Sequence, residues 1–166
     1  LEDCINSDLA NNFGNLCQRV TAFAIKNCEG KIPQDISFNK DDLKILDKFK
    51  NNLNLIRDKI DKQDVNFYID FIVNTLFDTN KYFNDQEPWK KKNDISRLNT
   101  IVYTTLEIVR KISYMLYPII PQSSLNALKI FSINEKDISL ASLENHLYLK
   151  GNNKIILGIF YMLAAS

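Results

Sequence analysis

The chain has 166 residues, enough for one domain with a hydrophobic core of its own. Its 21 Lys and Arg residues nearly balance 20 Asp and Glu residues, so the net charge of +1 argues against a generic, strongly basic nucleic-acid binder and leaves room for a local binding patch. Only four Gly and four Pro residues occur, which favours long, uninterrupted helices over many turns.

The first predicted helix ends near Gly30. Its apolar residues recur at alternating steps of four and three, which places them on one face of an amphipathic helix. These residues are Ile5, Leu9, Phe13, Leu16, Val20 and Phe23. Gly14 lies in the helix interior, where glycine costs about 0.5–1 kcal/mol relative to alanine. We therefore expect Gly14 to permit the close approach of another group, most commonly a neighbouring helix.

A polar row lies beside this apolar stripe. Asn11, Asn15 and Arg19 recur every four residues, so their side chains share one helix face. Two amides and a guanidinium in a row are suited to hydrogen bonding with the edges of nucleic-acid bases. A solvated helix flank is the simpler interpretation of the row taken alone.

The second and third predicted helices follow a loop at residues 31–38. The second begins near Asn39, with Asp41 and Asp42 in its first turn, where carboxylates complement the helix dipole. We prefer that role for the two aspartates to an acid–base couple. Asp64 is placed to cap the third helix, and residues 65–77 are apolar on most sides, which is typical of a central helix.

Asp94 is expected to cap the fourth helix, which carries a long apolar stripe. Pro118 and Pro121 cannot continue that helix, and residues 123–131 are typical of a short fifth helix. After Phe131 the pattern weakens. The predicted fold is all-α: a mostly antiparallel bundle of about five helices.

Signals for catalysis and metal binding are weak. No glycine-rich phosphate-binding loop occurs, and the single His146 allows neither a zinc site nor a His-based triad. Cys4, Cys17 and Cys28 include no C-x-x-C pair, so we interpret them as reduced thiols of a reducing compartment. The longest apolar run, residues 155–165, is shorter than the about 20 residues of a membrane helix. We expect no catalytic residue, metal site or membrane contact in this chain.

The stretch NDQEPWKKK holds the only tryptophan, in a polar break between the third and fourth predicted helices. Pro88 suits the first turn of a helix, where its missing N–H is no loss. It would fix the backbone so that Trp89 is presented to solvent. Local positive charge for phosphates would come from the lysines that follow, Lys90, Lys91 and Lys92. The alternatives are a Trp89 buried as a core anchor and a merely solvated run of lysines.

Three stretches resemble the anticodon-binding domain of methionyl-tRNA synthetases in order and approximate spacing: NSDLANNFGNLCQRV, NKYFNDQEPWK and LYPIIPQSS. The resemblance spans roughly residues 1–149. It implies an α-helical bundle of the class Ia synthetase type, which follows a class I catalytic domain. In that family an asparagine and an arginine of the first helix contact anticodon bases, and a tryptophan stacks on the first base of the CAU anticodon.

Position by position, the family's asparagine falls on Asn15, its arginine on Arg19, and its proline–tryptophan pair on Pro88–Trp89. We therefore predict that Trp89 stacks on a base, an interaction that contributes about 1–3 kcal/mol. Further possible RNA contacts are Asn11, Lys90, Lys91 and Lys92.

The chain departs from the family in two ways. It contains neither a His-Ile-Gly-His-like string nor a Lys-Met-Ser-Lys-Ser loop, so we expect it to be the carboxyl-terminal portion of a longer enzyme and inactive alone. Residues 150–166 do not match the family's ending, and no role is assigned to this tail. The predicted domain division is therefore a bundle at 1–149 and a tail at 150–166.

The resemblance implies anticodon recognition within a methionine–tRNA ligase, which attaches methionine to tRNA(Met) with ATP and Mg²⁺ in the cytoplasm. The implied partners are the tRNA(Met) anticodon loop and the catalytic domain of the same parent chain, and no cofactor is expected here. Two alternatives stay open. One is the anticodon-binding domain of a leucine, isoleucine, valine or cysteine synthetase. The other is a helical protein–protein interaction module that binds no RNA.

Overall fold

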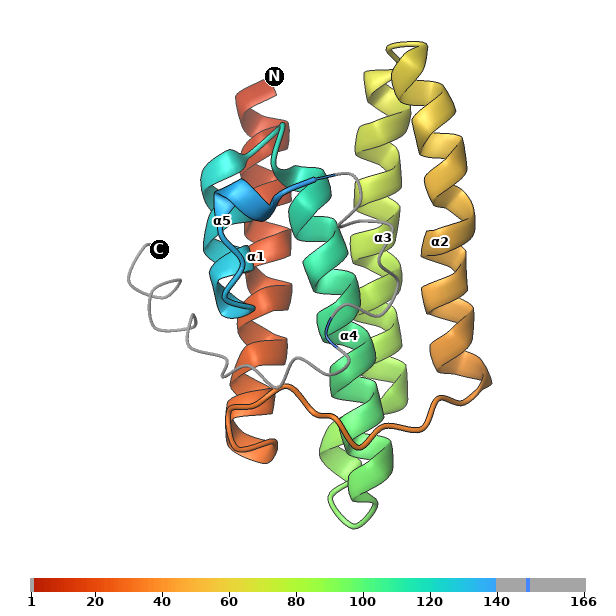
Figure 1. Ribbon diagram of the computed structural model, residues 1–166, viewed down its shortest axis with the longest axis vertical. Coiled ribbons are helices and arrows are strands. Elements are labelled where there is room, and N and C mark those ends of the chain that lie inside the picture. The colour runs from red at the N-terminus through yellow and green to blue at the C-terminus, as the bar shows by residue number, and fades with distance from the viewer. Residues whose placement is uncertain (1, 140–148, 150–166) are drawn as a thin grey trace.

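The computed structural model describes residues 2–139 and Leu149, and within these residues it contains five α-helices (Figure 1). The helices are α1 (Glu2–Asn27), α2 (Lys40–Asp61), α3 (Val65–Gln86), α4 (Ile95–Leu116) and α5 (Pro121–Ile130). Two single turns of 3₁₀-helix complete the list, η1 (Pro88–Lys90) and η2 (Glu135–Asp137). The predicted all-α bundle of about five helices is confirmed. The predicted boundary before residue 150, His146 and the apolar run at 155–165 lie outside the described residues.

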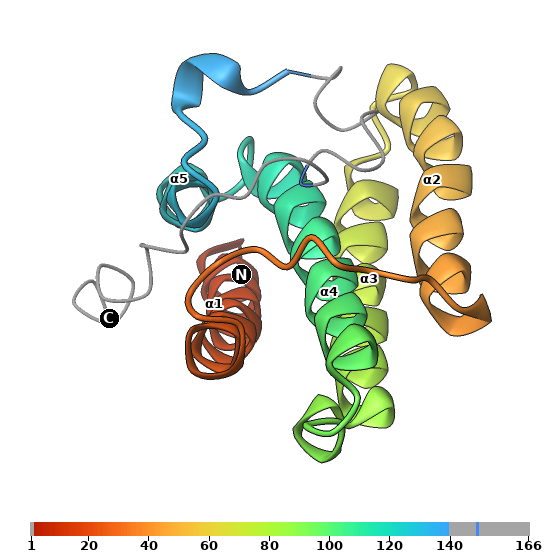
Figure 2. The ribbon, with the colours of Figure 1, turned by 60° about the horizontal axis from the view of Figure 1, so that its bottom comes forward.

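The helices pack around α4, which contacts each of the other four (Figure 2). In that view α1 and α5 lie on one side of α4, and α2 and α3 lie on the other. The α3–α4 connection, which holds η1, and the linker between α1 and α2 both lie at the lower end of the bundle in Figure 1. Residues far apart in sequence are therefore brought together at that end.

The helix starts follow from side-chain caps at predicted positions. Asp64 Oδ1 accepts a hydrogen bond from the Phe67 amide at 3.1 Å, and Asp94 Oδ1 accepts one from the Arg97 amide at 3.1 Å. Both satisfy N–H groups that have no partner inside the helix. The predicted caps of α3 and α4 are confirmed.

The central helix is α4, and the prediction that residues 65–77 form the central helix is wrong. Every residue from 100 to 116 is buried, whereas Val73 and Phe77 of α3 are 47% and 67% exposed. The sequence did not predict a central α4, because the buried threonines and serine of this helix are polar residues that usually lie at the surface. Thr104 Oγ1, for example, donates to the Thr100 carbonyl at 2.8 Å, and a hydroxyl that is satisfied within its own helix can be buried at low cost.

Gly14 does not lie against a neighbouring helix, so that expectation is also wrong. A Cβ atom built on Gly14 would meet no heavy atom within 4 Å other than its own helix and chain neighbours. The residue is only half-buried and faces open space. Its place in the helix is therefore not explained by packing within the described residues.

Buried charges on α4 are paired rather than isolated. Arg110 Nε lies 3.0 Å from Glu107 Oε2, and both side chains are fully buried. The Tyr103 hydroxyl donates to Glu107 Oε1 at 3.0 Å, and the Leu149 amide also donates to that oxygen. Burial lowers the pKa of the neighbouring Lys111 to about 8. The Glu107–Arg110 ion pair and its hydrogen bonds explain how these two charged side chains remain inside the bundle.

Candidate functional site

Three elements meet around Arg19 at one end of the bundle. Arg19 lies on α1, Phe83 and Asn84 in the last turn of α3, and Trp89 in η1. The guanidinium carbon of Arg19 is 5.0 Å from the centre of the Phe83 ring and 5.8 Å from that of the Trp89 ring. Arg19 Nη2 also donates to Asn84 Oδ1. The structure thus brings together two residues that the sequence singled out 70 positions apart.

The local backbone explains how Trp89 is presented. Glu87 adopts a left-handed conformation (φ 46°) that turns the chain at the end of α3, and Pro88 is the first residue of η1. The Lys91 amide closes the turn by donating to the Pro88 carbonyl at 3.0 Å. Pro88 is buried, whereas Trp89 remains 41% exposed. The turn therefore anchors the backbone through the proline and leaves part of the indole open to solvent.

The indole of Trp89 packs against the ring of Phe83. The Trp89 and Phe83 ring centres are 6.1 Å apart and their planes meet at 62°. Phe83 is 1% exposed and packs edge-on against Phe23 of α1, with ring centres 5.8 Å apart. Edge-to-face pairs of this kind are favourable contacts. The indole is thus held by Phe83 while its outer surface stays accessible.

The amides of α1 extend the site along the helix. Asn11 and Asn15 are exposed, and within the part of the chain that the structure describes neither side chain makes a hydrogen bond. Asn15 lies one turn before Arg19 and Asn11 one turn before Asn15. Their donor and acceptor groups therefore face solvent beside the Arg19 cluster.

The three lysines after Trp89 differ in their surroundings. Lys90 Nζ pairs with Glu87 Oε1 at 2.8 Å, Lys91 is half-buried, and Lys92 is exposed. An exposed ion pair such as Lys90–Glu87 contributes little to stability. Lys92 is the lysine of this run that stands most clearly open to a phosphate.

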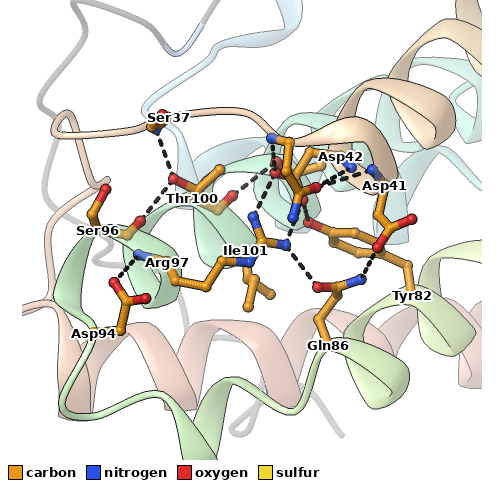
Figure 3. Close-up of polar contacts among 12 residues, drawn as sticks. Ser37, Asp41, Asp42, Tyr82, Gln86, Asp94, Ser96, Arg97, Thr100 and Ile101 are labelled. Carbon is orange, nitrogen blue, oxygen red and sulfur yellow. Dashed lines mark hydrogen bonds and ion pairs between the residues drawn. The ribbon is translucent and has the colours of Figure 1, made fainter.

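The contacts that hold the α3–α4 connection in place could not be predicted from the sequence (Figure 3). Arg97 Nη1 and Nη2 donate to Asp42 Oδ2 and Oδ1 at 2.7 and 2.8 Å, and the Tyr82 hydroxyl donates to Asp42 Oδ1. Arg97 Nη2 also donates to Gln86 Oε1 at 2.7 Å, and Gln86 Nε2 donates to Asp41 Oδ2 at 3.3 Å. The first turn of α2 is thereby joined to both ends of the segment that carries Trp89.

Asp42 therefore does more than complement the α2 dipole, the role expected for it. Its Oδ2 accepts from the Asn39 amide at 2.9 Å, while the Asn39 side chain accepts from the Asp42 amide at 3.1 Å, which forms a capping box. Burial opposes ionisation of this fully buried carboxyl. The hydrogen bonds from Arg97 and Tyr82 outweigh that effect and hold its pKa below the ordinary value. Asp42 is a charged partner inside the protein.

Phe83 and Asn84 are the site residues that sequence reasoning missed. Both lie within the NKYFNDQEPWK stretch, so their proximity to Trp89 in sequence was visible. What could not be seen is that the last turn of α3 faces Arg19 of α1. Among the described residues, no group of three or more His, Cys, Asp or Glu side chains is placed to hold a metal ion. None of the described helices is long and apolar enough to cross a membrane.

Comparison with known proteins decides the relationship of this chain. No protein-family profile matches it. The methionine–tRNA ligase of Brucella suis is 40% identical over 129 residues, which cover 77% of this chain and 25% of that protein. The methionine–tRNA ligase of Thermotoga maritima is 34% identical over 156 residues, which cover 93% of this chain and 25% of that protein. The chain is a homologue of the methionine–tRNA ligases.

Solved structures give the same relationship. The crystal structure of ligand-free methionyl-tRNA synthetase from Mycobacterium tuberculosis superposes with a TM-score of 0.81 at 30% identity, over 94% of this chain and 32% of that one. The same enzyme in complex with methionyl-adenylate gives a TM-score of 0.82. The five-helix bundle is therefore a fold shared with a segment of methionyl-tRNA synthetase. The chain spans about a quarter of the length of the curated methionine–tRNA ligases that it matches.

Proposed function

We propose that this chain recognises the CAU anticodon of tRNA(Met) as the anticodon-binding part of a methionine–tRNA ligase. The observation that carries the proposal is the cluster of Arg19 and Trp89, with an exposed indole beside a guanidinium at one end of the bundle. An aromatic ring and a guanidinium are the two side-chain planes on which unpaired RNA bases stack. Homology to methionine–tRNA ligases supports tRNA(Met) as the RNA.

The division of labour among the site residues follows from their chemistry. The accessible surface of Trp89 stacks on the first anticodon base. Stacking contributes affinity for RNA but does not distinguish one base from another. The amide of Asn15 and the guanidinium of Arg19 reach base edges, where hydrogen bonds distinguish one base from another. Lys92, and more weakly the paired Lys90 and half-buried Lys91, contact the backbone of the loop, and Asn11 extends the amide row beside Asn15. This arrangement gives a chain of net charge +1 a specific, local RNA-binding surface.

The parent enzyme forms methionyl-adenylate from methionine and ATP with Mg²⁺, and then transfers methionine to tRNA(Met) in the cytoplasm. The M. tuberculosis synthetase bound to methionyl-adenylate supports this reaction for a homologue of this chain. We assign to this chain RNA binding and discrimination alone, because the matching segment is about a quarter of the ligases.

The proposed second partner is the catalytic domain of the same parent chain. An apolar surface on α1 and α3 borders a groove of about 440 Å³ and includes Ile5, Val73 and Phe77, which are 44%, 47% and 67% exposed. Contiguous exposed apolar side chains are typical of a surface that another domain covers. In the full-length protein, hydroxyl-radical footprinting should show Phe77 protected relative to this chain, and equal labelling would exclude it from the contact.

Intrinsic fluorescence tests the RNA-binding proposal, because Trp89 is the only tryptophan. A CAU stem-loop should quench the emission, since stacking places a base against the indole. A stem-loop that differs only in the first anticodon base should quench less at equal concentration. Trp89→Ala and Trp89→Phe lack this reporter, so their binding is measured by the anisotropy of a labelled stem-loop. Trp89→Ala should lose about a factor of 10 or more in affinity, and Trp89→Phe less.

Both alternatives make different predictions in the same experiment. The anticodon-binding domain of another class Ia synthetase would prefer a stem-loop with a different anticodon. A protein–protein interaction module would show no change in fluorescence with any stem-loop. That last result, together with unfolding of the bundle by Trp89→Ala, would make Trp89 a core anchor and reject the proposal.

A further inference from the structure

We infer that the buried Asp42–Arg97 ion pair is a positioning device for RNA recognition, which holds the α3–α4 connection so that Trp89 is ready to receive a base. The connection at residues 87–94 is fixed at both ends to the first turn of α2 (Figure 3). Gln86, at the end of α3, bonds to Asp41 and Arg97, and Arg97, at the start of α4, bonds to Asp42. The inference rests on the proposed function of Trp89.

The chemistry of Asp42 makes this junction rigid. Its two carboxylate oxygens accept from both terminal nitrogens of Arg97, from the Tyr82 hydroxyl and from the Asn39 amide. A bidentate guanidinium–carboxylate pair fixes angle as well as distance. Because Asp42 is fully buried, the pair is shielded from water and salt. The four donors come from α3, α4 and the residue before α2, so one carboxylate joins three parts of the fold.

Asp42 cannot act by touching RNA, since its side chain is 0% exposed, and the Arg97 side chain is only 15% exposed. Its effect must pass through the orientation of neighbouring segments. A loop that is already fixed in its binding conformation loses less conformational freedom when the ligand binds. Releasing either end of residues 87–94 would let Trp89 sample other orientations, and RNA binding would then have to order the turn.

Asp42→Asn gives a test in which two explanations predict opposite signs. Removal of a negative charge near a polyanion should strengthen RNA binding if long-range electrostatics dominates. Loss of positioning should weaken it, and we expect roughly tenfold weaker binding of a CAU RNA hairpin at 25 °C. Binding would be measured by fluorescence anisotropy of a labelled hairpin. An affinity equal to or tighter than that of the unmodified chain overturns the inference.

Asp78→Asn is the matched control. Asp78 Oδ2 pairs with Lys48 Nζ at 2.6 Å, so this ion pair also joins α2 to α3, but it is 30% and 58% exposed and lies outside the connection. The same substitution removes the same charge there. We expect hairpin affinity to change by less than about twofold, because exposed pairs contribute little. A loss equal to that of Asp42→Asn would show that any broken α2–α3 contact weakens binding.

A second readout separates positioning from general destabilisation. Time-resolved anisotropy of Trp89 in the RNA-free protein should reveal faster local motion of the indole in Asp42→Asn than in Asp78→Asn, with helical circular dichroism unchanged. An unchanged Trp89 decay contradicts the inference. If Asp42→Asn fails to fold, Gln86→Ala removes the hydrogen bonds of Gln86 with Asp41 and Arg97 and leaves the Asp42–Arg97 pair in place. It should give a change in the decay of the same sign and about threefold weaker binding. An unaltered decay and affinity in that variant would also overturn it.

The salt dependence distinguishes Arg97 as a positioning residue from Arg97 as a phosphate contact. Loss of a phosphate contact reduces the slope of log affinity against log salt by about 1. Arg97→Gln should weaken hairpin binding with no change in that slope, and a reduced slope would reassign the residue. Trp89→Ala distinguishes a failure of the proposed function from a failure of the positioning role. If it leaves binding unchanged, the proposed function fails, and if it weakens binding while Asp42→Asn does not, only the positioning role fails.

Discussion

Arg19 occupies a position where two kinds of contact coincide. It stacks over Phe83 and Trp89 and donates to Asn84, while the face of α1 beside it carries the exposed Asn15. Contacts with two rings and one amide restrict the conformations of the arginine side chain. The proposed base contact therefore starts from an ordered side chain.

Arg19→Ala should weaken binding of a CAU stem-loop by about 1–3 kcal/mol, the usual value of a base-edge contact. The control is Lys62→Ala. Lys62 lies just after α2, is exposed, and pairs with Asp58 at 3.0 Å. Its loss should leave affinity nearly unchanged, because the α2–α3 turn lies at the end of the bundle opposite the α3–α4 connection (Figure 1). Equal losses of affinity, measured by titration of Trp89 fluorescence, would reduce Arg19 to a general electrostatic role.

At the scale of the element, Gly14 destabilises helix α1, and no packing contact in the described fold requires a glycine at this position. A Cβ at Gly14 would lie in open space, and the residue is in the middle of a 26-residue helix. Glycine there loses backbone entropy without allowing any close packing.

Gly14→Ala should therefore raise the free energy of unfolding by about 0.5–1 kcal/mol. Urea denaturation followed by circular dichroism measures the change. Gly30→Ala is the contrasting variant, because Gly30 has a φ of 68° and alanine there is strained. It should lower stability. A destabilising Gly14→Ala would mean that the helix needs glycine for a reason other than packing.

The N-cap of α3 gives a second prediction for an element. Asp64→Ala removes the acceptor of the Phe67 amide and should lower the free energy of unfolding by about 0.5–2 kcal/mol. Asp70→Ala replaces the same residue type at an exposed position inside the same helix, where alanine is the better helix former. It should leave stability unchanged or raise it. Equal destabilisation by both variants would argue against the cap.

At the scale of the whole molecule, the Asp42 network makes stability depend on pH. The pKa of Asp42 is lowered in the folded protein, so the unfolded state binds more protons in the window between its own pKa and the lower folded value. Stability from this group is fully present above the ordinary value of 3.8 and is lost as pH falls through the folded pKa.

At neutral pH, Asp42→Asn should lower the free energy of unfolding by up to about 3–5 kcal/mol, because it leaves the Arg97 guanidinium without a charged partner. The difference between this variant and the unmodified chain should shrink as the pH is lowered below about 4. Urea denaturation at pH 7, 5 and 3 checks both statements. A difference that stays constant across this range would show that folding does not lower the pKa of Asp42.

A further prediction at the scale of the whole molecule concerns catalytic activity. The chain contains no glycine-rich phosphate loop, and it corresponds to about a quarter of the methionine–tRNA ligases. We expect no methionine-dependent exchange of pyrophosphate into ATP by the pure chain, under conditions in which an intact ligase is active. Clear exchange activity would mean that the chain holds a catalytic site of its own.

The sequence by itself determined the local features of this protein. Helix class, the caps at Asp64 and Asp94, and the proline-led turn at Pro88 depend on a few neighbouring residues, and the printed sequence contains all of them. The same is true of the motifs that linked the chain to methionyl-tRNA synthetases. The pairing of Arg19 with Trp89 as site residues came from that family pattern rather than from periodicity.

Only the tertiary structure decided which helix is central and what holds Trp89 in place. The hydroxyl groups of α4 bond to carbonyls of the same helix, so this helix can be buried despite its polar residues. The apolar pattern of residues 65–77 therefore predicted the wrong central helix. Asp42 and Arg97 are 55 positions apart, and no local signal pairs two charges across that separation. Burial turns their attraction into a fixed contact, because a buried carboxylate without its guanidinium is costly. The exposure of the proposed RNA-binding indole is therefore a property of the assembled bundle.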